Sequence, residues 1–318
     1  MFDALFDAWS PFASLPRSGA AAQSTHPGEF TSGRYAEDEH VLDYRLFIPS
    51  DPGSQPMPLV VMLHGCGQNA ADFACGTGMN RLAEEYGCLV LYPEQPASAH
   101  WNRCWNWYDQ AHQRRGEGEP ALIVGLIRRI MAEHAVDARQ VAVAGLSSGG
   151  AMAVILGRTY PDLFSAVGCH SGMAHGSATS GADAMLAMRH GPDPATLAQT
   201  GSHTGPPVIV FHGDADATVH RRNSCCVVRQ SVDSQAAQRR NEPARIAIVE
   251  QTGWTGGRKF TRKIHQKKTG GVLAEHWTVH GTGHVWSGGK PGGSYTDIHG
   301  PDASEEMLRF FMGHPGTA

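Results

Sequence analysis

Short apolar runs alternate with helix-like segments along most of this chain. Continuous apolar runs bounded by turn residues are typical of strands buried on both faces of a sheet. Such strands are predicted at 59–63, 88–92, 140–144 and 207–211. Two further strands are predicted at 40–49, where apolar and polar residues broadly alternate, and at 276–279. Helices are predicted at 79–86, 120–134, 151–159, 223–239 and 304–311.

This order of strands and helices predicts the fold class. Strands that alternate with helices favour an α/β protein with a mostly parallel sheet covered by helices on both faces. Residues 1–33 are rich in Ala, Ser, Pro and Gly and are expected to form a flexible N-terminal arm. No linker divides the remainder, so residues 34–318 are interpreted as a single domain.

Composition and charge narrow the possible partners. The net charge of −4 offers no electrostatic reason to expect nucleic acid. The one basic stretch, 258–268, is interpreted as a solvated hairpin or loop. No apolar run reaches the ~18 residues of a membrane span. The N-terminus has no early Lys or Arg, so no secretory leader is visible. Two alternatives follow: the protein is cytoplasmic, or it is extracellular and its export segment has been lost.

The segment 140–150, QVAVAGLSSGG, contains the candidate nucleophile. Gly145-Leu146-Ser147-Ser148-Gly149 matches G-x-S-x-G between a predicted strand and a predicted helix. This context is typical of the nucleophile elbow of α/β-hydrolases, a sharp turn that exposes a serine hydroxyl. The alternative is an ordinary helix N-cap serine, which predicts no catalytic partners elsewhere in the chain.

The acid and the base are expected after the nucleophile, in the order serine, acid, histidine. Two carboxylates follow the strand 207–211, Asp214 and Asp216, and the spacing favours Asp216 as the acid, with Asp214 structuring the loop. Of 18 histidines, His284 follows the last predicted strand in a Gly-rich loop, the position where this fold presents its base.

The mechanism also requires an oxyanion hole, a pair of N–H donors that stabilises the tetrahedral intermediate. The backbone N–H of Ser148 is one predicted donor, and that of Cys66, in the loop after 59–63, is the other. A cysteine nucleophile at 66 is the alternative. Nucleophilic catalysis by a serine, a histidine and a carboxylate needs no cofactor, and none is expected. The seven cysteines include no C-x-x-C pair, so no metal site is expected.

Together these residues resemble the polyhydroxybutyrate (PHB) depolymerase family of esterases, whose near relatives are feruloyl and acetylxylan esterases. The matching segments are LHGCGQNA (63–70), LYPEQ (91–95), CWNWYD (104–109), GEPALI (118–123), VAGLSSGGAMA (143–153), YPDLFSAVGCHSG (160–172), HGDADATV (212–219), GTGHVWSGG (281–289) and GSYTDIHGPDASEEMLRFF (293–311).

The resemblance implies an α/β-hydrolase fold, a triad of Ser147, Asp216 and His284, and the two oxyanion donors above. It implies aromatic residues at the substrate cleft, for which Trp105 and Trp286 are the candidates, with core packing as the alternative. Trp107 is interpreted as core. A disulfide between Cys66 and Cys104 is a further hypothesis, because both lie in motif loops near the site.

The resemblance makes an ester the expected substrate, most simply a short-chain polyhydroxyalkanoate or its oligomers. Because neither a leader nor an appended polymer-binding domain is visible, soluble oligomers, amorphous polyester or small esters are favoured over crystalline polymer. Feruloyl or acetylxylan esterase activity is the alternative, followed by acyl transfer to an alcohol and by a non-catalytic binding protein.

Overall fold

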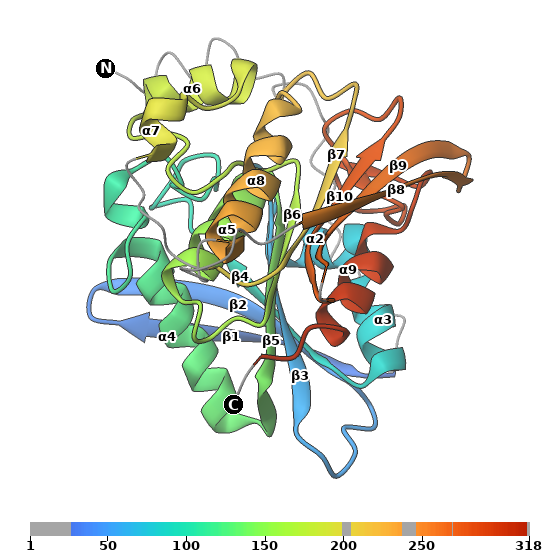
Figure 1. The fold of residues 1–318 in the computed structure, drawn as a ribbon. Helices are drawn as coiled ribbons and strands as arrows, with labels where there is room; N and C mark the ends of the chain where they lie inside the picture. The colour runs from blue at the N-terminus through green and yellow to red at the C-terminus, as the bar shows by residue number, and fades with distance from the viewer. Residues whose placement is uncertain (1–26, 199–204, 237–245, 269, 317–318) are drawn as a thin grey trace.

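The computed structural model describes residues 27–198, 205–236, 246–268 and 270–316. Within these segments ten strands form one mixed sheet in the order β1-β2-β4-β3-β5-β6-β7-β10-β9-β8 (Figure 1). The parallel centre consists of β4 (Leu89–Glu94), β3 (Met57–Leu63), β5 (Val136–Leu146), β6 (Ala166–His170), β7 (Val208–Gly213) and β10 (Val272–Val279). The predicted α/β-hydrolase fold with a mostly parallel sheet is therefore confirmed.

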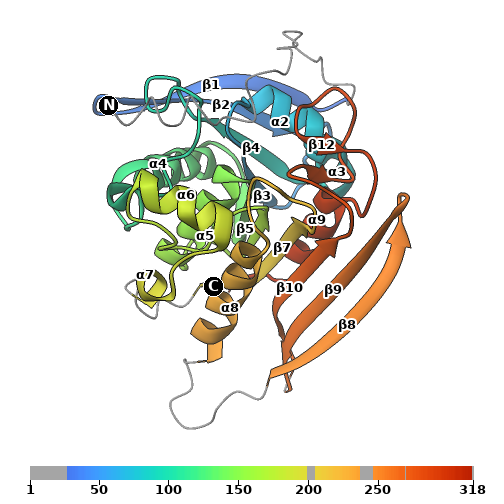
Figure 2. The same cartoon turned by 90° about the horizontal axis from the view of Figure 1, so that it is seen from above.

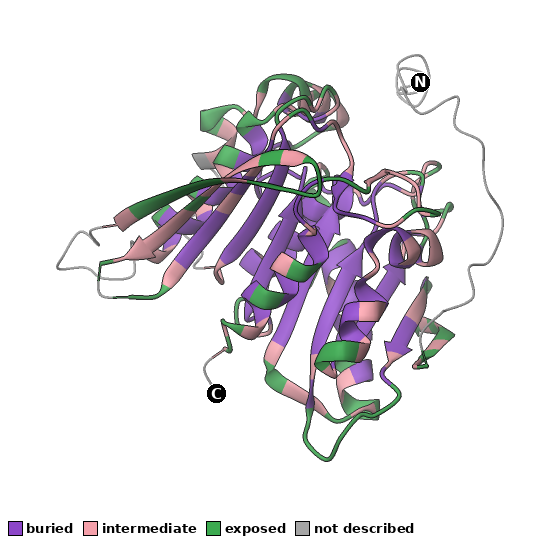
Figure 3. Cartoon of the chain, turned by 90° about the vertical axis from the view of Figure 1, so that its right-hand side faces the viewer, coloured by how far each residue is buried: buried purple, intermediate pink, exposed green. Residues whose placement is uncertain are grey.

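Antiparallel strands complete both edges of the sheet. One edge holds β1 (Glu29–Glu37) and β2 (His40–Ile48), and the other holds β9 (Arg258–Lys267) and β8 (Ile246–Thr255). The basic segment 258–268 thus lies in a hairpin, which is one of the two conformations expected from the sequence. In this hairpin β8 is largely exposed and β9 is mostly half-buried, whereas the central strands are buried (Figure 3).

The structure corrects the boundary between the expected N-terminal arm, residues 1–33, and the domain that follows it. Glu29 already pairs with Ile48, so β1 begins within the arm. In this edge strand Phe30, Gly33 and Tyr35 are half-buried and the other residues are exposed. Residues 1–26 of the arm lie outside the described residues.

Helices cover both faces of the sheet (Figure 2). One face carries α4 (Gly118–Glu133), α5 (Ser148–Thr159), α6 (Gly181–His190) and α8 (Arg222–Ala236). The other carries α2 (Ala70–Thr77), α3 (Met79–Tyr86) and α9 (Ala303–Met312). Shorter elements are η1 (Gln110–His112), α7 (Pro194–Ala198), and the strand pair β11 (Trp286–Ser287) and β12 (Thr296–Asp297). No helix in the described segments is long and apolar enough to cross a bilayer.

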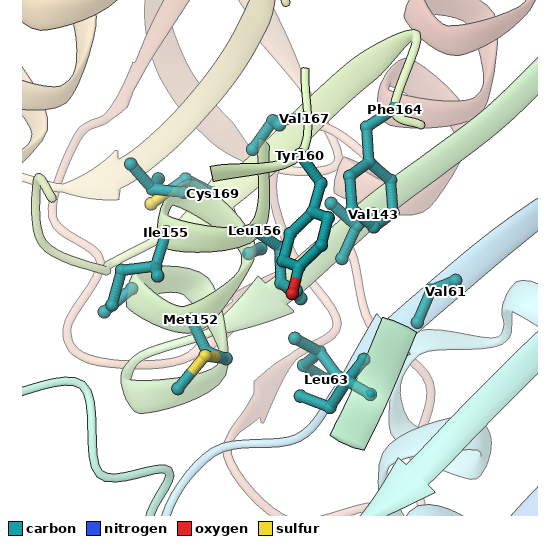
Figure 4. Packing of buried hydrophobic residues seen from close by; sticks show 14 of the residues in the cluster. Val61, Leu63, Val143, Met152, Ile155, Leu156, Tyr160, Phe164, Val167 and Cys169 are labelled. Atoms are coloured by element: carbon teal, nitrogen blue, oxygen red, sulfur yellow. The ribbon is translucent and has the colours of Figure 1, made fainter. Parts of the chain in front are cut away.

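The central helix α5 explains why the nucleophile candidate is held rigidly. Every residue from Ser148 to Arg158 is buried, and all of them except Ser148 and Arg158 are apolar or glycine, as expected of a helix enclosed by the fold. Met152 and Leu156 belong to the same core cluster as Leu63 of β3 and Val143 of β5 (Figure 4). The N-terminus of α5 is therefore anchored directly beyond the ends of the central strands.

Candidate active site

Ser147 occupies a strained turn between β5 and α5. Its φ of 57° and ψ of −117° lie in a region that residues other than glycine rarely adopt. The flanking glycines make this turn possible. A Cβ on Gly145 would lie 2.4 Å from the carbonyl carbon of Gly149, and a Cβ on Gly149 would lie 2.1 Å from Leu63 O. The geometry is that of a nucleophile elbow, as the motif and its context predict.

Asp216 and His284 meet because β7 and β10 are parallel neighbours. The carboxyl ends of these two strands lie side by side, so the loops that follow them face each other. His284 Nδ1 donates to Asp216 Oδ2 at 2.7 Å. The other carboxylate oxygen accepts from the backbone N–H groups of Thr218 and Val219, at 2.9 and 2.8 Å. The carboxylate is thus fully engaged, and its side chain has no solvent exposure.

The environment of Asp216 favours its charged form. Burial raises the pKa of this carboxyl, but the hydrogen bond from His284, the nearby imidazoles of His284 and His212, and the backbone donor Val219 together bring the pKa below its ordinary value. An ionised Asp216 holds the proton of His284 on Nδ1, which leaves Nε2 as the nitrogen able to accept a proton.

Asp214, the rival carboxylate, has different partners. Its Oδ2 accepts from His280 Nδ1 at 2.6 Å, and its Oδ1 accepts from Gly281 N at 2.7 Å. These contacts join the loop after β7 to the loop that carries His284. The arrangement matches the loop-structuring role expected from the sequence.

No hydrogen bond joins His284 to Ser147 within the described residues. Within the described segments Ser147 Oγ makes no hydrogen bond, and its residue is 9% exposed. Catalytic hydrogen bonds are often long or misaligned in enzymes without substrate and tighten when substrate binds.

The loop after β3 presents one candidate oxyanion donor. Three of its backbone N–H groups are already used: Gly65 N donates to Gln68 Oε1 at 2.9 Å, Gly67 N to Asn102 O at 2.7 Å, and Gln68 N to Gly65 O at 3.2 Å. Of this loop's described residues, Cys66 keeps an N–H without an intramolecular acceptor. That is the donor the sequence predicts.

The second candidate donor lies close to the first. Ser148 is the first residue of α5, where backbone N–H groups have no acceptor within the helix. Its Oγ lies 3.4 Å from Cys66 Sγ, so the two segments are in contact. Two N–H groups at a helix N-terminus and an adjacent loop can together stabilise an oxyanion.

The predicted disulfide between Cys66 and Cys104 is confirmed, with the two Cα atoms 4.3 Å apart. It ties the oxyanion loop to the loop that contains CWNW. A cysteine in a disulfide has no thiolate to act as a nucleophile, so the alternative of a cysteine nucleophile at position 66 is wrong for this structure.

Comparison with known proteins identifies the family. Residues 42–242 match the family described as esterase PHB depolymerase. The chain belongs to this family. It is 31% identical over 236 residues to poly(3-hydroxyalkanoate) depolymerase C of Paucimonas lemoignei, covering 71% of this chain and 54% of that protein. The chain therefore spans about half the length of that relative.

Other similar proteins belong to the neighbouring esterase groups. Feruloyl esterase B of Neurospora crassa is 30% identical over 199 residues, covering 58% of this chain and 67% of that protein. Among solved structures, acetyl xylan esterase from Aspergillus awamori has a TM-score of 0.63 at 20% identity, covering 85% of this chain and 94% of that one. This structural similarity supports the fold that we assign to this member of the PHB depolymerase family.

Trp105 and Trp286 were expected to contact substrate, and the structure contradicts this expectation. Both residues are 0% exposed, so neither indole offers a face to a substrate. Their N–H groups are also used internally: Trp105 Nε1 donates to His64 O at 3.1 Å, and Trp286 Nε1 to Ser304 Oγ at 3.0 Å. They are core residues beneath the site, and Trp107, at 5% exposure, is core as expected.

The structure places a different aromatic side chain beside the oxyanion loop. Tyr295 Oη would lie 3.9 Å from a Cβ built on Gly67, the neighbour of Cys66. Tyr295 has a φ of 52°, which is strained for a bulky residue. Among the described residues, four of the five non-glycine residues with positive φ lie in segments around the site: Arg103, Ser147, Ser171 and Tyr295. Sequence reasoning did not single out Tyr295, because its position beside Gly67 brings together residues that lie far apart in the chain.

Metal chemistry was not expected from the sequence. In the segments that the structure describes, no group of three or more His, Cys, Asp or Glu side chains is arranged to hold a metal ion.

Proposed function

We propose that this chain is a serine esterase in which Ser147, His284 and Asp216 form a catalytic triad. The observation that carries the proposal is the 2.7 Å hydrogen bond between His284 Nδ1 and buried Asp216, in loops that follow parallel strands of the same sheet as the strand before the nucleophile elbow. In this mechanism His284 Nε2 accepts the Ser147 proton as Oγ attacks the ester carbonyl.

The tetrahedral intermediate then collapses to an acyl-enzyme. The backbone N–H groups of Cys66 and Ser148 stabilise the oxyanion, and His284 returns its proton to the departing alkoxide. Water, deprotonated by His284, attacks the acyl carbonyl in the second half of the cycle and releases the carboxylic acid. Asp216 holds the imidazole in one tautomer and stabilises the imidazolium formed in each half.

Short-chain polyhydroxyalkanoate oligomers or amorphous polyester are the substrates we propose. Support comes from family membership and from the 31% identity to poly(3-hydroxyalkanoate) depolymerase C. The competing substrate class is a feruloyl or acetylated carbohydrate ester, which the 30% identity to a feruloyl esterase B favours. Acyl transfer to an alcohol uses the same acyl-enzyme, with the alcohol replacing water.

The mechanism is tested by Ser147→Ala. We expect kcat on p-nitrophenyl butyrate to fall by about 10⁴-fold or more, since the loss of a triad member leaves only binding and the oxyanion hole. Ser234→Ala is the matched control, because Ser234 lies far along α8 and its hydroxyl donates only to Ser231 O. Unchanged hydrolysis by Ser147→Ala would overturn the mechanism.

The substrate class needs a separate experiment with the unaltered chain. We expect kcat/KM on a hydroxybutyrate trimer to exceed that on methyl ferulate and on acetylated xylan oligosaccharides. The reverse order would assign the chain to the carbohydrate-ester branch. Product analysis with an added alcohol separates hydrolysis from transfer, because a transferase forms the new ester at the expense of free acid.

A further inference from the structure

His170 lies at the carboxyl end of β6, between the candidate nucleophile and the base loop, and is fully buried. Its backbone carbonyl accepts the N–H of Ser147 at 2.8 Å. One main-chain group of His170 therefore helps to hold the elbow. No role for His170 follows from the sequence.

The imidazole of His170 binds the opposite side of the site. Ser287 N donates to His170 Nε2 at 3.1 Å, and Ser287 is three residues beyond His284. A backbone N–H can only donate, so Nε2 must carry the lone pair and the ring proton must be on Nδ1. Nδ1 in turn lies 3.2 Å from Ser171 Oγ, which accepts that proton. Both ring nitrogens are therefore satisfied in a single tautomer.

The ring of His170 is also stacked between two aromatic side chains. Its centroid is 5.7 Å from that of Phe211, at 18°, and 5.1 Å from that of Trp286, at 27°. Phe211 belongs to β7, the strand that leads to Asp216, and Trp286 follows His284 by two residues. Through backbone, ring nitrogen and ring faces, His170 thus contacts the segments that carry all three triad candidates.

The surroundings of His170 keep the imidazole neutral. Burial, followed by the neighbouring His212 and His284, lowers the pKa of His170 to about 3, although Asp216 acts in the opposite direction. A neutral ring retains the Nε2 lone pair that accepts from Ser287. It also adds no second positive charge when His284 becomes an imidazolium during catalysis.

We propose that His170 is a positioning residue: its neutral Nε2 fixes the Ser287 backbone and thereby holds the base loop at the distance from Ser147 that proton transfer requires. This inference rests on the triad proposed above. The competing explanation is that His170 only fills space between Phe211 and Trp286, a task that phenylalanine would perform equally well.

Two substitutions distinguish these explanations. His170→Phe keeps an aromatic ring but removes the acceptor. His170→Gln gives up the stacking but restores an acceptor near the position of Nε2. His276→Phe is the control, because His276 is a half-buried imidazole hydrogen-bonded to Ser224 Oγ at 3.0 Å, and its partner is on α8 rather than on a catalytic loop.

For each variant we would measure kcat and KM on p-nitrophenyl butyrate, the melting temperature, and the rate at which a fluorophosphonate labels Ser147. We expect His170→Phe to lower kcat and the labelling rate by about 10- to 100-fold with KM changed less than about twofold, since a misplacement near 1 Å can cost that much. His170→Gln should recover kcat to within about fivefold of the unaltered chain, and His276→Phe should stay within about twofold.

Different outcomes refute the positioning role of His170 and the proposed triad. A His170→Phe variant with unchanged kcat, or one whose loss of kcat equals that of His276→Phe, would overturn the positioning role. Should His170→Phe fail to fold, the decision passes to His170→Gln, and a folded glutamine variant with a tenfold or greater loss of kcat would equally refute it. Ser147→Ala, assayed alongside, tests the triad itself: full activity there would refute the proposed function rather than the role of His170.

Discussion

Asp214 and His280 form a second acid–imidazole pair, with Oδ2 and Nδ1 2.6 Å apart, on the same two loops that carry Asp216 and His284. Asp214 also accepts the N–H of Gly281, three residues before the candidate base. The inner pair is buried and the outer pair is about one-third exposed. The outer pair thus joins the two loops, while the inner pair has the geometry for catalysis.

This division of labour predicts unequal effects of removing each charge. Asp216→Asn should lower kcat by about 10⁴-fold, because the wrong imidazole tautomer is then favoured. Asp214→Asn should lower it only about three- to tenfold, because an amide oxygen can still accept from Gly281. Steady-state kinetics on one soluble ester measures both, and equal losses would contradict the assignment of Asp216 as the acid.

The disulfide predicts a redox-sensitive oxyanion hole. Cys104→Ser frees the loop whose Cys66 N–H is the proposed donor, and the loss of one such donor costs about 10²–10³ in kcat. We expect a tenfold or larger loss, because the loop is loosened rather than removed. Exposed, unpaired Cys225 provides the control, Cys225→Ser, which should keep its kcat. A Cys104→Ser enzyme with full kcat would show that the loop holds its shape without the bond.

Because Trp286 is buried, we expect its substitution to lower the stability of the protein without weakening substrate binding. Trp286→Phe removes the hydrogen bond to Ser304 and part of a fully buried ring, so the free energy of unfolding should fall by about 2–3 kcal/mol. KM for short esters should change by less than about twofold, because the indole has no exposed surface. Chemical denaturation and kinetics measure the two quantities. A large rise in KM at unchanged stability would restore the cleft role for Trp286.

The elbow glycines predict a steric failure. A Cβ at Gly149 would lie 2.1 Å from Leu63 O and 2.5 Å from His64 O, both backbone atoms that cannot move without displacing β3. Gly149→Ala should therefore abolish activity or prevent folding. Gly181→Ala is the matched control, since nothing lies within 4 Å of a Cβ there. Circular dichroism and esterase assays give the outcome, and an active, stable Gly149→Ala protein would argue against the elbow.

The half-buried His276 leads to a prediction of how stability depends on pH. Burial, and then the neighbouring His212, His265 and Lys263, lower the pKa of His276 to about 4. Between the ordinary value near 6.5 and about 4, the unfolded chain binds a proton that the folded chain does not, so stability is lost as pH falls through this window.

His276→Gln should therefore lessen the loss of stability between pH 7 and pH 4.5, by an amount on the order of 2 kcal/mol. Urea denaturation of both proteins at the two pH values measures it. If the two proteins lose the same free energy between these pH values, His276 does not contribute to the acid sensitivity.

Features that depend on residues close together in the chain could be predicted without a structure. Continuous apolar runs identified the central strands because burial on both faces requires apolar side chains at every position. The elbow at Ser147 was identifiable because its glycines, its strand and its helix are adjacent in the chain. The order of Asp216 and His284 followed from loops that come directly after strands β7 and β10.

The burial of individual side chains, and the contacts between groups that are distant in the chain, became known only from the folded structure. Whether Trp105 and Trp286 face a cleft or the core depends on the segments that cover them, which lie far away in the chain. The β8 strand was missed because an exposed edge strand has mixed polarity and no strong period. The proposed role of His170 depends on its contact with Ser287, which lies more than 100 residues away in the chain. Such contacts form only through packing, so no local pattern of residues could reveal them.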